Sequence, residues 1–145
     1  MELAFHQARF SGLKIDFDLA PDLPLLQVNQ NRLRQVFLAL AINALEACSG
    51  QGRLTIRTLE RASQAGSEVA IEFQDTGCGI APELLERIFE PFFTTKGEQR
   101  GTGLGLAICH GIAQRILGGK LSANSVLDQG SCFTLSFPAQ APTGA

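Results

Sequence analysis

The chain has 145 residues, of which 45% are hydrophobic and 18% are charged, and its formal net charge is −2. This length suits one domain with one core, and the small negative charge argues against a protein that binds nucleic acid through general electrostatics. No apolar run approaches the length of a bilayer span, and the start of the chain lacks the pattern of a signal peptide. We therefore expect a soluble, cytoplasmic domain without membrane contact of its own, although its parent protein could be membrane-anchored.

The first part of the chain predicts a strand followed by a long helix. We expect residues 1–12 to be the end of an upstream helix or a linker, and the alternation of apolar residues at 13–19 predicts a strand. A proline-bounded loop then leads to a short predicted strand at 25–28. Residues 30–48 predict a helix with Asn29 as its N-cap.

Asn43 interrupts an otherwise apolar stretch of this helix, so its side chain needs a polar partner. An amide oxygen suits magnesium, which usually takes only one or two protein oxygens and completes its shell with phosphates and water. The alternative is a structural amide that bonds to neighbouring backbone. The single residue leaves both interpretations open.

A hairpin is predicted next, with strands at 53–59 and 67–75 around a loop that contains Gly66. Alternation along the second strand places Asp75 on the same inward side as the apolar residues. An inward carboxylate needs a partner, and the exocyclic amino group of a purine would serve. The alternative is an aspartate that starts a turn with Gly77.

Two glycine clusters, DTGCGI at 75–80 and GTGLGL at 101–106, frame the candidate site. The first follows a strand and the second opens a predicted helix, and both positions are typical of backbone that approaches phosphates. Between them, a short helix is predicted at Pro82, followed by a loop. The aromatic residues of FEPFF could anchor this loop as a lid, and Lys96 either reaches a phosphate or is an ordinary solvated charge. We therefore expect a nucleotide site under a lid.

The last part of the chain predicts one helix and two strands. Four apolar residues at four-residue spacing predict the buried face of the helix: Leu104, Ile108, Ile112 and Ile116. Strands are predicted at 119–124 and 131–137, and 139–145 is a predicted tail. In the final strand, three alternating residues are expected to face the core: Phe133, Leu135 and Phe137.

The cysteines and histidines carry no metal or catalytic signature. The four cysteines are Cys48, Cys78, Cys109 and Cys132. Their spacing is neither that of paired metal ligands nor that of a dense disulfide pattern, so we expect most of them to be small core residues. Cys78 falls inside the first glycine cluster, where a thiol could lie near a ligand. The two histidines, His6 and His110, are expected to be surface or core residues.

Four motifs together resemble those of a known family. They are NALEA at 43–47, DTGCGI at 75–80, FEPFFTTK at 89–96 and GTGLGLAI at 101–108. In this order they resemble the ATP-binding catalytic domain of sensor histidine kinases, and the resemblance covers residues 13–138. The wording of FEPFFTTK and of the closing segments GGKLSANS and GSCFTLSFP is most similar to the branch of nitrogen-regulation and dicarboxylate sensors. The wider superfamily includes DNA gyrase, a mismatch-repair ATPase and heat-shock chaperone ATPases.

This resemblance implies an α+β fold of two layers, in which helices back a mixed, mostly antiparallel sheet and ATP lies between the long helix and a lid. It implies ATP and Mg²⁺ as cofactors, with Asn43 as the magnesium ligand and Asp75 as the residue that reads adenine. The full set of implied nucleotide-binding residues is Asn43, Asp75, Gly77, Gly79, Ile80, Lys96, Gly101, Thr102, Gly103, Leu104 and Gly105.

The resemblance also implies that the phosphate acceptor lies outside this chain. Kinases of the family modify a histidine next to an acidic residue on a separate dimerisation domain, and neither His6 nor His110 has that context. The implied function is transfer of the γ-phosphate of Mg-ATP to that dimerisation and phosphoacceptor domain. The receiver domain of a response regulator then takes the phosphate to an aspartate, which is two-component signal transduction.

Ala39 departs from the family pattern. The family usually carries a second asparagine one turn before Asn43, and its hydrolytic members carry a glutamate there that activates water. Alanine can do neither, which argues against a gyrase-like ATPase. Beside the histidine kinase, two alternatives stay open, of which Ala39 permits the first. One is a degenerate nucleotide-binding sensor or scaffold without phosphotransfer, and the other is a stand-alone ATPase or serine kinase of the same superfamily.

Overall fold

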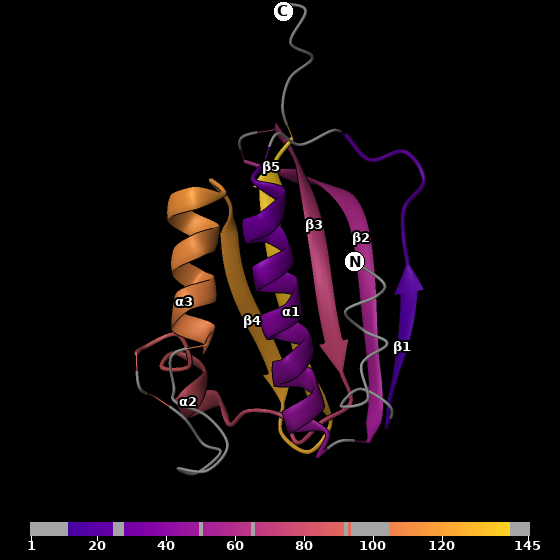
Figure 1. The fold of residues 1–145 in the computed structure, drawn as a ribbon, viewed down its shortest axis with the longest axis vertical. Coiled ribbons are helices and arrows are strands. Elements are labelled where there is room, and N and C mark those ends of the chain that lie inside the picture. Colours follow the sequence, from indigo (N-terminus) through magenta and orange to yellow (C-terminus); the bar gives the residue numbers. More distant parts are fainter. Residues whose placement is uncertain are drawn as a thin grey trace, which may run out of the picture.

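Five strands form one sheet, and helices cover one of its faces (Figure 1). The computed structural model describes residues 12–24, 28–49, 51–64, 66–91, 93 and 105–139. The strands are β1 (Leu13–Asp18), β2 (Gly52–Ser63), β3 (Gly66–Asp75), β4 (Lys120–Val126) and β5 (Gly130–Pro138). Their order in the sheet is β1-β2-β3-β5-β4; β1 pairs with β2 in parallel and the other pairs are antiparallel. The predicted mixed, mostly antiparallel sheet is confirmed.

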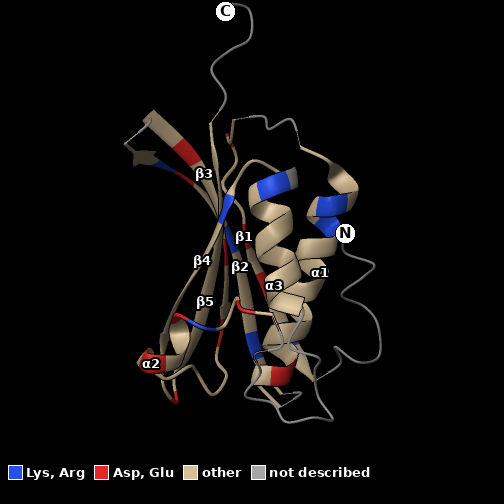
Figure 2. Ribbon diagram, turned by 90° about the vertical axis from the view of Figure 1, so that its left-hand side faces the viewer, with Lys and Arg blue, Asp and Glu red and all other residues tan. Residues whose placement is uncertain are grey.

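Two helices make the second layer of the sandwich. The helices of the described chain are α1 (Gln30–Ala47), α2 (Pro82–Leu85) and α3 (Gly105–Gly111), and α3 continues as a π-helical stretch at Ile112–Ile116. Helices α1 and α3 lie on the same side of the sheet, which Figure 2 shows edge-on. The predicted N-cap of α1 is confirmed, since the Asn29 side chain accepts the N–H of Arg32 at 3.1 Å. None of the described helices is long and apolar enough to span a membrane.

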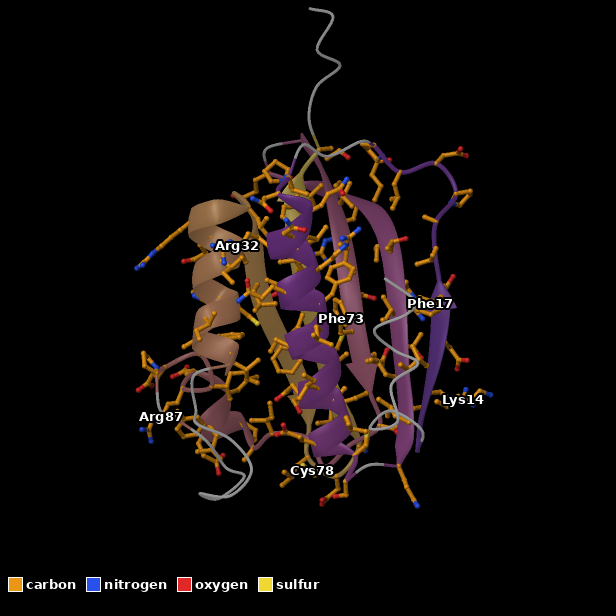
Figure 3. All side chains as sticks on the ribbon, in the orientation of Figure 1. Lys14, Phe17, Arg32, Phe73, Cys78 and Arg87 are labelled. Atoms are coloured by element: carbon orange, nitrogen blue, oxygen red, sulfur yellow. The ribbon has the colours of Figure 1, made fainter. Side chains whose placement is uncertain are left out.

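The core lies between the sheet and α1. Phe73 of β3 sits behind α1 (Figure 3), and its ring meets that of Phe37 edge to face, with centroids 5.1 Å apart. Burial of each such side chain contributes about 1.5–3 kcal/mol. Three residues of β5 face this core as predicted: Phe133, Leu135 and Phe137. The alternation of β5 therefore fixes which face of the sheet receives the helices.

The opposite face of the sheet carries charge instead of helices. Arg57 on β2 pairs with Asp18 of β1 at 3.1 Å and with Glu72 of β3 at 3.5 Å. Exposed pairs of this kind contribute little, about 0–1 kcal/mol each. These charged pairs lie on the face opposite α1 and α3, and the candidate site is sought on the helical side.

The predicted buried face of α3 is wrong at Ile108, which is 48% exposed. The buried residues of this helical segment include Cys109, Ile112 and Ala113. A four-residue spacing overshoots one helical turn by about 40° per step, so such a row winds away from the core. The prediction for Leu104 falls outside the described residues.

Two strand boundaries also differ from the predictions. Strands β2 and β3 extend to Ser63 and Gly66, which pair with each other, so Gly66 belongs to the hairpin ladder rather than to its loop. Val28 lies in no strand, and the rest of the short strand predicted at 25–28 falls outside the described residues. The hairpin is longer than predicted, and Asp75 is the last residue of β3 as predicted.

Candidate functional site

Asp75 is the last residue of β3 and lies beside the C-terminal end of α1. It is only 3% exposed, which confirms the predicted inward direction. Its Oδ1 accepts the N–H of Gly77 at 2.9 Å and that of Ser131 at 3.2 Å. The turn with Gly77, expected as an alternative, is therefore also present. Two backbone N–H donors fix the orientation of the carboxylate, and this orientation is compatible with a role in recognising a base.

Gly77 and Gly79 are glycines because protein backbone lies against them. A Cβ on Gly77 would lie 2.6 Å from the carbonyl oxygen of Ala47, at the end of α1. A Cβ on Gly79 would lie 2.3 Å from the carbonyl oxygen of Val126, and the φ of Gly79 is +74°. Close contact with other protein segments is thus sufficient to explain why Gly77 and Gly79 are glycines, and a nearby phosphate is not needed for this explanation.

The loop that contains these glycines is held from both sides. The N–H of Cys78 donates to the carbonyl oxygen of Ala47 at 3.0 Å, and the N–H of Asp128 donates to the carbonyl oxygen of Cys78 at 2.7 Å. Figure 3 shows Cys78 at the lower end of α1. The N–H of Ile80 donates to the Ser125 hydroxyl at 2.7 Å. The loop is therefore tied to α1 and to the β4–β5 hairpin.

Asn43 lies one helical turn before Ala47 and is half-buried. The separation along the helix axis is about 6 Å, so Asn43 belongs to the same end of the molecule as Asp75. Within the described ranges, no group of three or more His, Cys, Asp or Glu side chains could hold a metal. A lone amide oxygen fits magnesium that is bound mainly by phosphates and water. Ala39 packs against the core one turn earlier and offers no ligand.

Gly105 is the first residue of α3, and the described residues leave its Cβ position uncovered. A Cβ built on Gly105 would have no described atom within 4 Å, apart from its own neighbouring backbone. Protein packing among these residues therefore does not require a glycine here, in contrast to Gly77 and Gly79. The other residues of the predicted site beyond Ile80 lie outside the described residues: Lys96, Gly101, Thr102, Gly103 and Leu104.

Comparison with known proteins decides the family. Residues 28–141 match the family described as histidine kinase-, DNA gyrase B-, and HSP90-like ATPase. The chain belongs to this family.

The similar proteins point to the histidine kinase group within it. Sensor histidine kinase ZraS of Escherichia coli O157:H7 is 38% identical to this ATPase domain over 138 residues, which are 95% of this chain and 29% of ZraS. The catalytic domain of histidine kinase ThkA is 30% identical with a TM-score of 0.77, and the match covers 95% of this chain and 86% of that domain. The predicted catalytic domain of a histidine kinase is thereby confirmed. The chain spans less than a third of the length of ZraS.

Two further structures show relatives with a nucleotide analogue or with a partner. Full-length ShkA in complex with AMPPNP has a TM-score of 0.78 and 32% identity, and the match covers 99% of this chain and 29% of ShkA. ThkA in complex with the response regulator protein TrrA has a TM-score of 0.70 and 28% identity, over 88% of this chain and 34% of ThkA.

The aromatic residues that were expected to anchor a lid are in part attached to the body of the ATPase domain. Phe89 stacks on His110 of α3 with ring centroids 4.9 Å apart and lies edge to face with Phe133 at 6.3 Å. The guanidinium of Arg87 lies 4.9 Å from the ring centre of Phe93. Phe92 falls outside the described residues. His110 is thus a half-buried packing histidine, as expected.

Burial raises the pKa of three thiols and so favours their protonated form. Burial raises the pKa of Cys48, and the nearby Asp75 carboxylate adds to this effect. Burial raises the pKa of Cys109 from 9.0 to about 11, and burial with the Glu72 charge raises that of Cys132. Cys78 is exposed. Because the thiolate is the reactive form, the three buried or half-buried cysteines are not nucleophiles at neutral pH.

The sequence analysis missed two serines of the site. Ser125 and Ser131 join the Asp75 loop to the β4–β5 hairpin through side-chain and backbone hydrogen bonds. The available signal was alternation, since both serines fall on the inward side of strands whose other inward residues are apolar. A hydroxyl at such a position needs a partner.

Proposed function

We propose that this ATPase domain binds Mg-ATP and donates the γ-phosphate to a histidine on a separate dimerisation and phosphoacceptor domain of its parent protein. A response regulator receiver domain then takes the phosphate, and both steps take place in the cytoplasm. The observation that carries the proposal is the buried Asp75 carboxylate, aimed by two backbone donors at the end of the helix that carries Asn43.

In the proposed complex, Asp75 recognises the base and Asn43 holds the metal ion. Asp75 accepts a hydrogen bond from the 6-amino group of adenine, which is a charge-assisted bond of roughly 1.5–3 kcal/mol. Asn43 supplies one oxygen to the magnesium ion, which neutralises the phosphate charge when it is bound. We assign the Cβ side of Gly105, where no described atom lies within 4 Å apart from its own neighbouring backbone, to the phosphate part of the ligand. The domain thus orients ATP, and positioning with charge neutralisation dominates phosphoryl transfer in general.

The proposed reaction is transfer rather than hydrolysis. The bond between the γ-phosphorus and the bridging oxygen breaks, a bond from phosphorus to an imidazole nitrogen of the acceptor histidine forms, and ADP leaves. Ala39 occupies the position one turn before Asn43 and cannot act as a general base for water. His110 stacks on Phe89, which supports an acceptor outside this chain.

The relatives support the partners of this proposal. The ShkA structure contains AMPPNP, and the ThkA structure contains the response regulator TrrA. By analogy, this chain would use ATP and act before a response regulator.

The direct test is phosphate transfer to an acceptor. The chain is incubated with γ-labelled ATP, magnesium and a purified dimerisation fragment that carries the acceptor histidine. We expect label on the fragment, and none when its histidine is replaced by alanine. Binding of ATP without any transfer would favour the degenerate sensor or scaffold. Steady release of phosphate without the fragment would favour a stand-alone ATPase.

A further inference from the structure

Ser125 of β4 is the centre of a hydrogen-bond cluster that joins three segments. Its Oγ accepts the N–H of Ile80 at 2.7 Å and donates to the carbonyl oxygen of Gly130 at 3.0 Å. The same oxygen lies 2.9 Å from the Oγ of Ser131. Ser125 therefore connects the loop after Asp75 with the turn and the first residues of β5.

The Ser125 hydroxyl can satisfy all of these contacts at once. Its proton can go to the carbonyl oxygen of Gly130, which only accepts. Its oxygen accepts the Ile80 N–H, and in the 2.9 Å contact with Ser131 either hydroxyl can donate. One donated bond and two accepted bonds are the full capacity of a hydroxyl.

This arrangement extends to the carboxylate of Asp75. The backbone N–H of Ser131 donates to Asp75 Oδ1 at 3.2 Å, and Ser131 is itself buried. A Cβ on Gly130 would lie 2.1 Å from the carbonyl oxygen of Asp75, so the hairpin also packs on the Asp75 backbone. Ser125 thus acts on Asp75 through Ser131, and on the following loop through Ile80.

We propose that Ser125 is a positioning residue for base recognition, which sets the preference of the site for a purine with a 6-amino group. This inference rests on the proposed function, because it assumes that Asp75 reads the base. Ser125 itself need not touch the nucleotide. Its part is to hold Asp75 and the Ile80 loop in the geometry that the base requires.

The preference follows from hydrogen-bond chemistry. A carboxylate accepts hydrogen bonds and does not donate them, so it favours a 6-amino group over a 6-oxo group. This discrimination depends on where the carboxylate points. Without the Ser125 hydroxyl, the Ile80 N–H and the Ser131 hydroxyl lose their common partner, so the segment whose Ser131 N–H holds Asp75 is less firmly placed. The magnesium end, at Asn43 on α1, is not part of the cluster.

Calorimetric titration of the full chain with ATP and with inosine triphosphate tests the proposal. The two nucleotides differ at position 6 of the purine, where inosine has an oxygen in place of the amino group. Loss of the supporting hydrogen bonds in Ser125→Ala should weaken ATP binding about tenfold and inosine triphosphate binding less than about threefold. The ratio of ATP affinities with and without magnesium should stay unchanged.

The control is Ser122→Ala, an exposed serine on the opposite face of β4, which should keep the wild-type preference. Ser125→Thr keeps the hydroxyl and should also retain it. Ser125→Cys keeps the volume but has a weakly bonding thiol, so it should lose the preference. This variant also gives the readout if Ser125→Ala does not fold.

Two results would overturn the proposal, and they differ from each other. A folded Ser125→Ala or Ser125→Cys variant with the wild-type preference for ATP would make Ser125 a structural residue only, and the role of Asp75 would stand. A wild-type chain with equal affinity for the two nucleotides would remove the base-reading role of Asp75, and the inference would fall with it.

Discussion

The two glycine-bearing ends of the site differ in what surrounds their glycines. At the base end, a Cβ on Gly77 or Gly79 would lie within 2.6 Å of the backbone of α1 or of the β4–β5 turn. At the other end, a Cβ on Gly105 would have no described atom within 4 Å, apart from its own neighbouring backbone. Glycine therefore stands in two different settings, since packing requires it at Gly77 and Gly79 and no described atom requires it at Gly105.

Asp75, at the end of the site assigned to the base, is held in place by protein groups. Its Oδ1 accepts the N–H groups of Gly77 and Ser131. A preformed end costs less ordering on binding. We therefore expect substitutions that disturb the packing at Gly77 or Gly79 to lower stability, and a substitution at Gly105 to alter mainly nucleotide binding.

Gly79→Ala should give the largest effect. Its φ of +74° and the Val126 carbonyl oxygen at 2.3 Å leave no place for a methyl group. The free energy of unfolding should fall by about 2–4 kcal/mol, as measured by urea denaturation. Gly111→Ala is the matched control, because this helical glycine has no described atom near its Cβ position. In Gly111→Ala the free energy of unfolding should rise by about 0.5–1 kcal/mol. An equal fall in both variants would contradict the difference between the two glycines.

Asp75→Asn should separate recognition from folding at the base end. The asparagine oxygen can still accept the N–H groups of Gly77 and Ser131, while the charge that favours the purine amino group is lost. ATP affinity should drop roughly tenfold to hundredfold and the melting temperature should change little. Unchanged affinity in calorimetry would argue against base reading by Asp75.

Substitution of Cys109 tests whether α3, the helix that begins at Gly105, is tightly packed. Its pKa in the fold is raised from 9.0 to about 11 by burial. The neutral thiol contributes fully below pH 9.0, and the contribution is lost as the pH rises towards 11. The stability advantage of wild type over Cys109→Ala should therefore shrink by about 2 kcal/mol over this range. The exposed Cys78 gives the control variant Cys78→Ala, and a parallel pH profile for Cys109→Ala and wild type would contradict the packing.

Gly105→Ala should have the smallest effect on the fold. Because its Cβ position is free of described atoms, stability should stay the same or rise by about 0.5–1 kcal/mol. ATP affinity should fall about threefold to tenfold, because a methyl group enters the space that we assign to the ligand. Thermal unfolding and calorimetry on the same sample give both numbers. If Gly105→Ala binds ATP with the affinity of the wild type, Gly105 is not part of the nucleotide site.

Local pattern was sufficient for the five strands of the sheet, for α1 and for the direction of Asp75, but the strand predicted at 25–28 is not present at Val28. Alternation along β3 placed the carboxylate inward, and Asn29 marked the start of α1. The same local reasoning failed at Ile108, because it applied a spacing that does not stay on one helix face. The spacing of apolar residues predicts burial only where it matches the period of the helix or strand that carries them.

Long-range contacts were beyond local pattern. The reason for Gly79 is Val126, and the partner of Ile80 is Ser125, in each case a segment of β4 that is distant in sequence. Nothing in DTGCGI itself distinguishes a glycine that faces a carbonyl of the protein from one that faces a phosphate. The resemblance to histidine kinases supplied the assignment of the motif, and the structure supplied the packing reason for its glycines.

The most direct test of the central claim is a calorimetric titration of the full chain with ATP, with and without magnesium, for wild type and Asn43→Ala. The account predicts tighter binding in the presence of magnesium for wild type, because Asn43 supplies an oxygen to the ion that the phosphates hold. In Asn43→Ala most of this magnesium dependence should disappear while the fold is kept. An equal dependence on magnesium in both proteins would make Asn43 a structural amide, and absence of ATP binding to wild type would contradict the account.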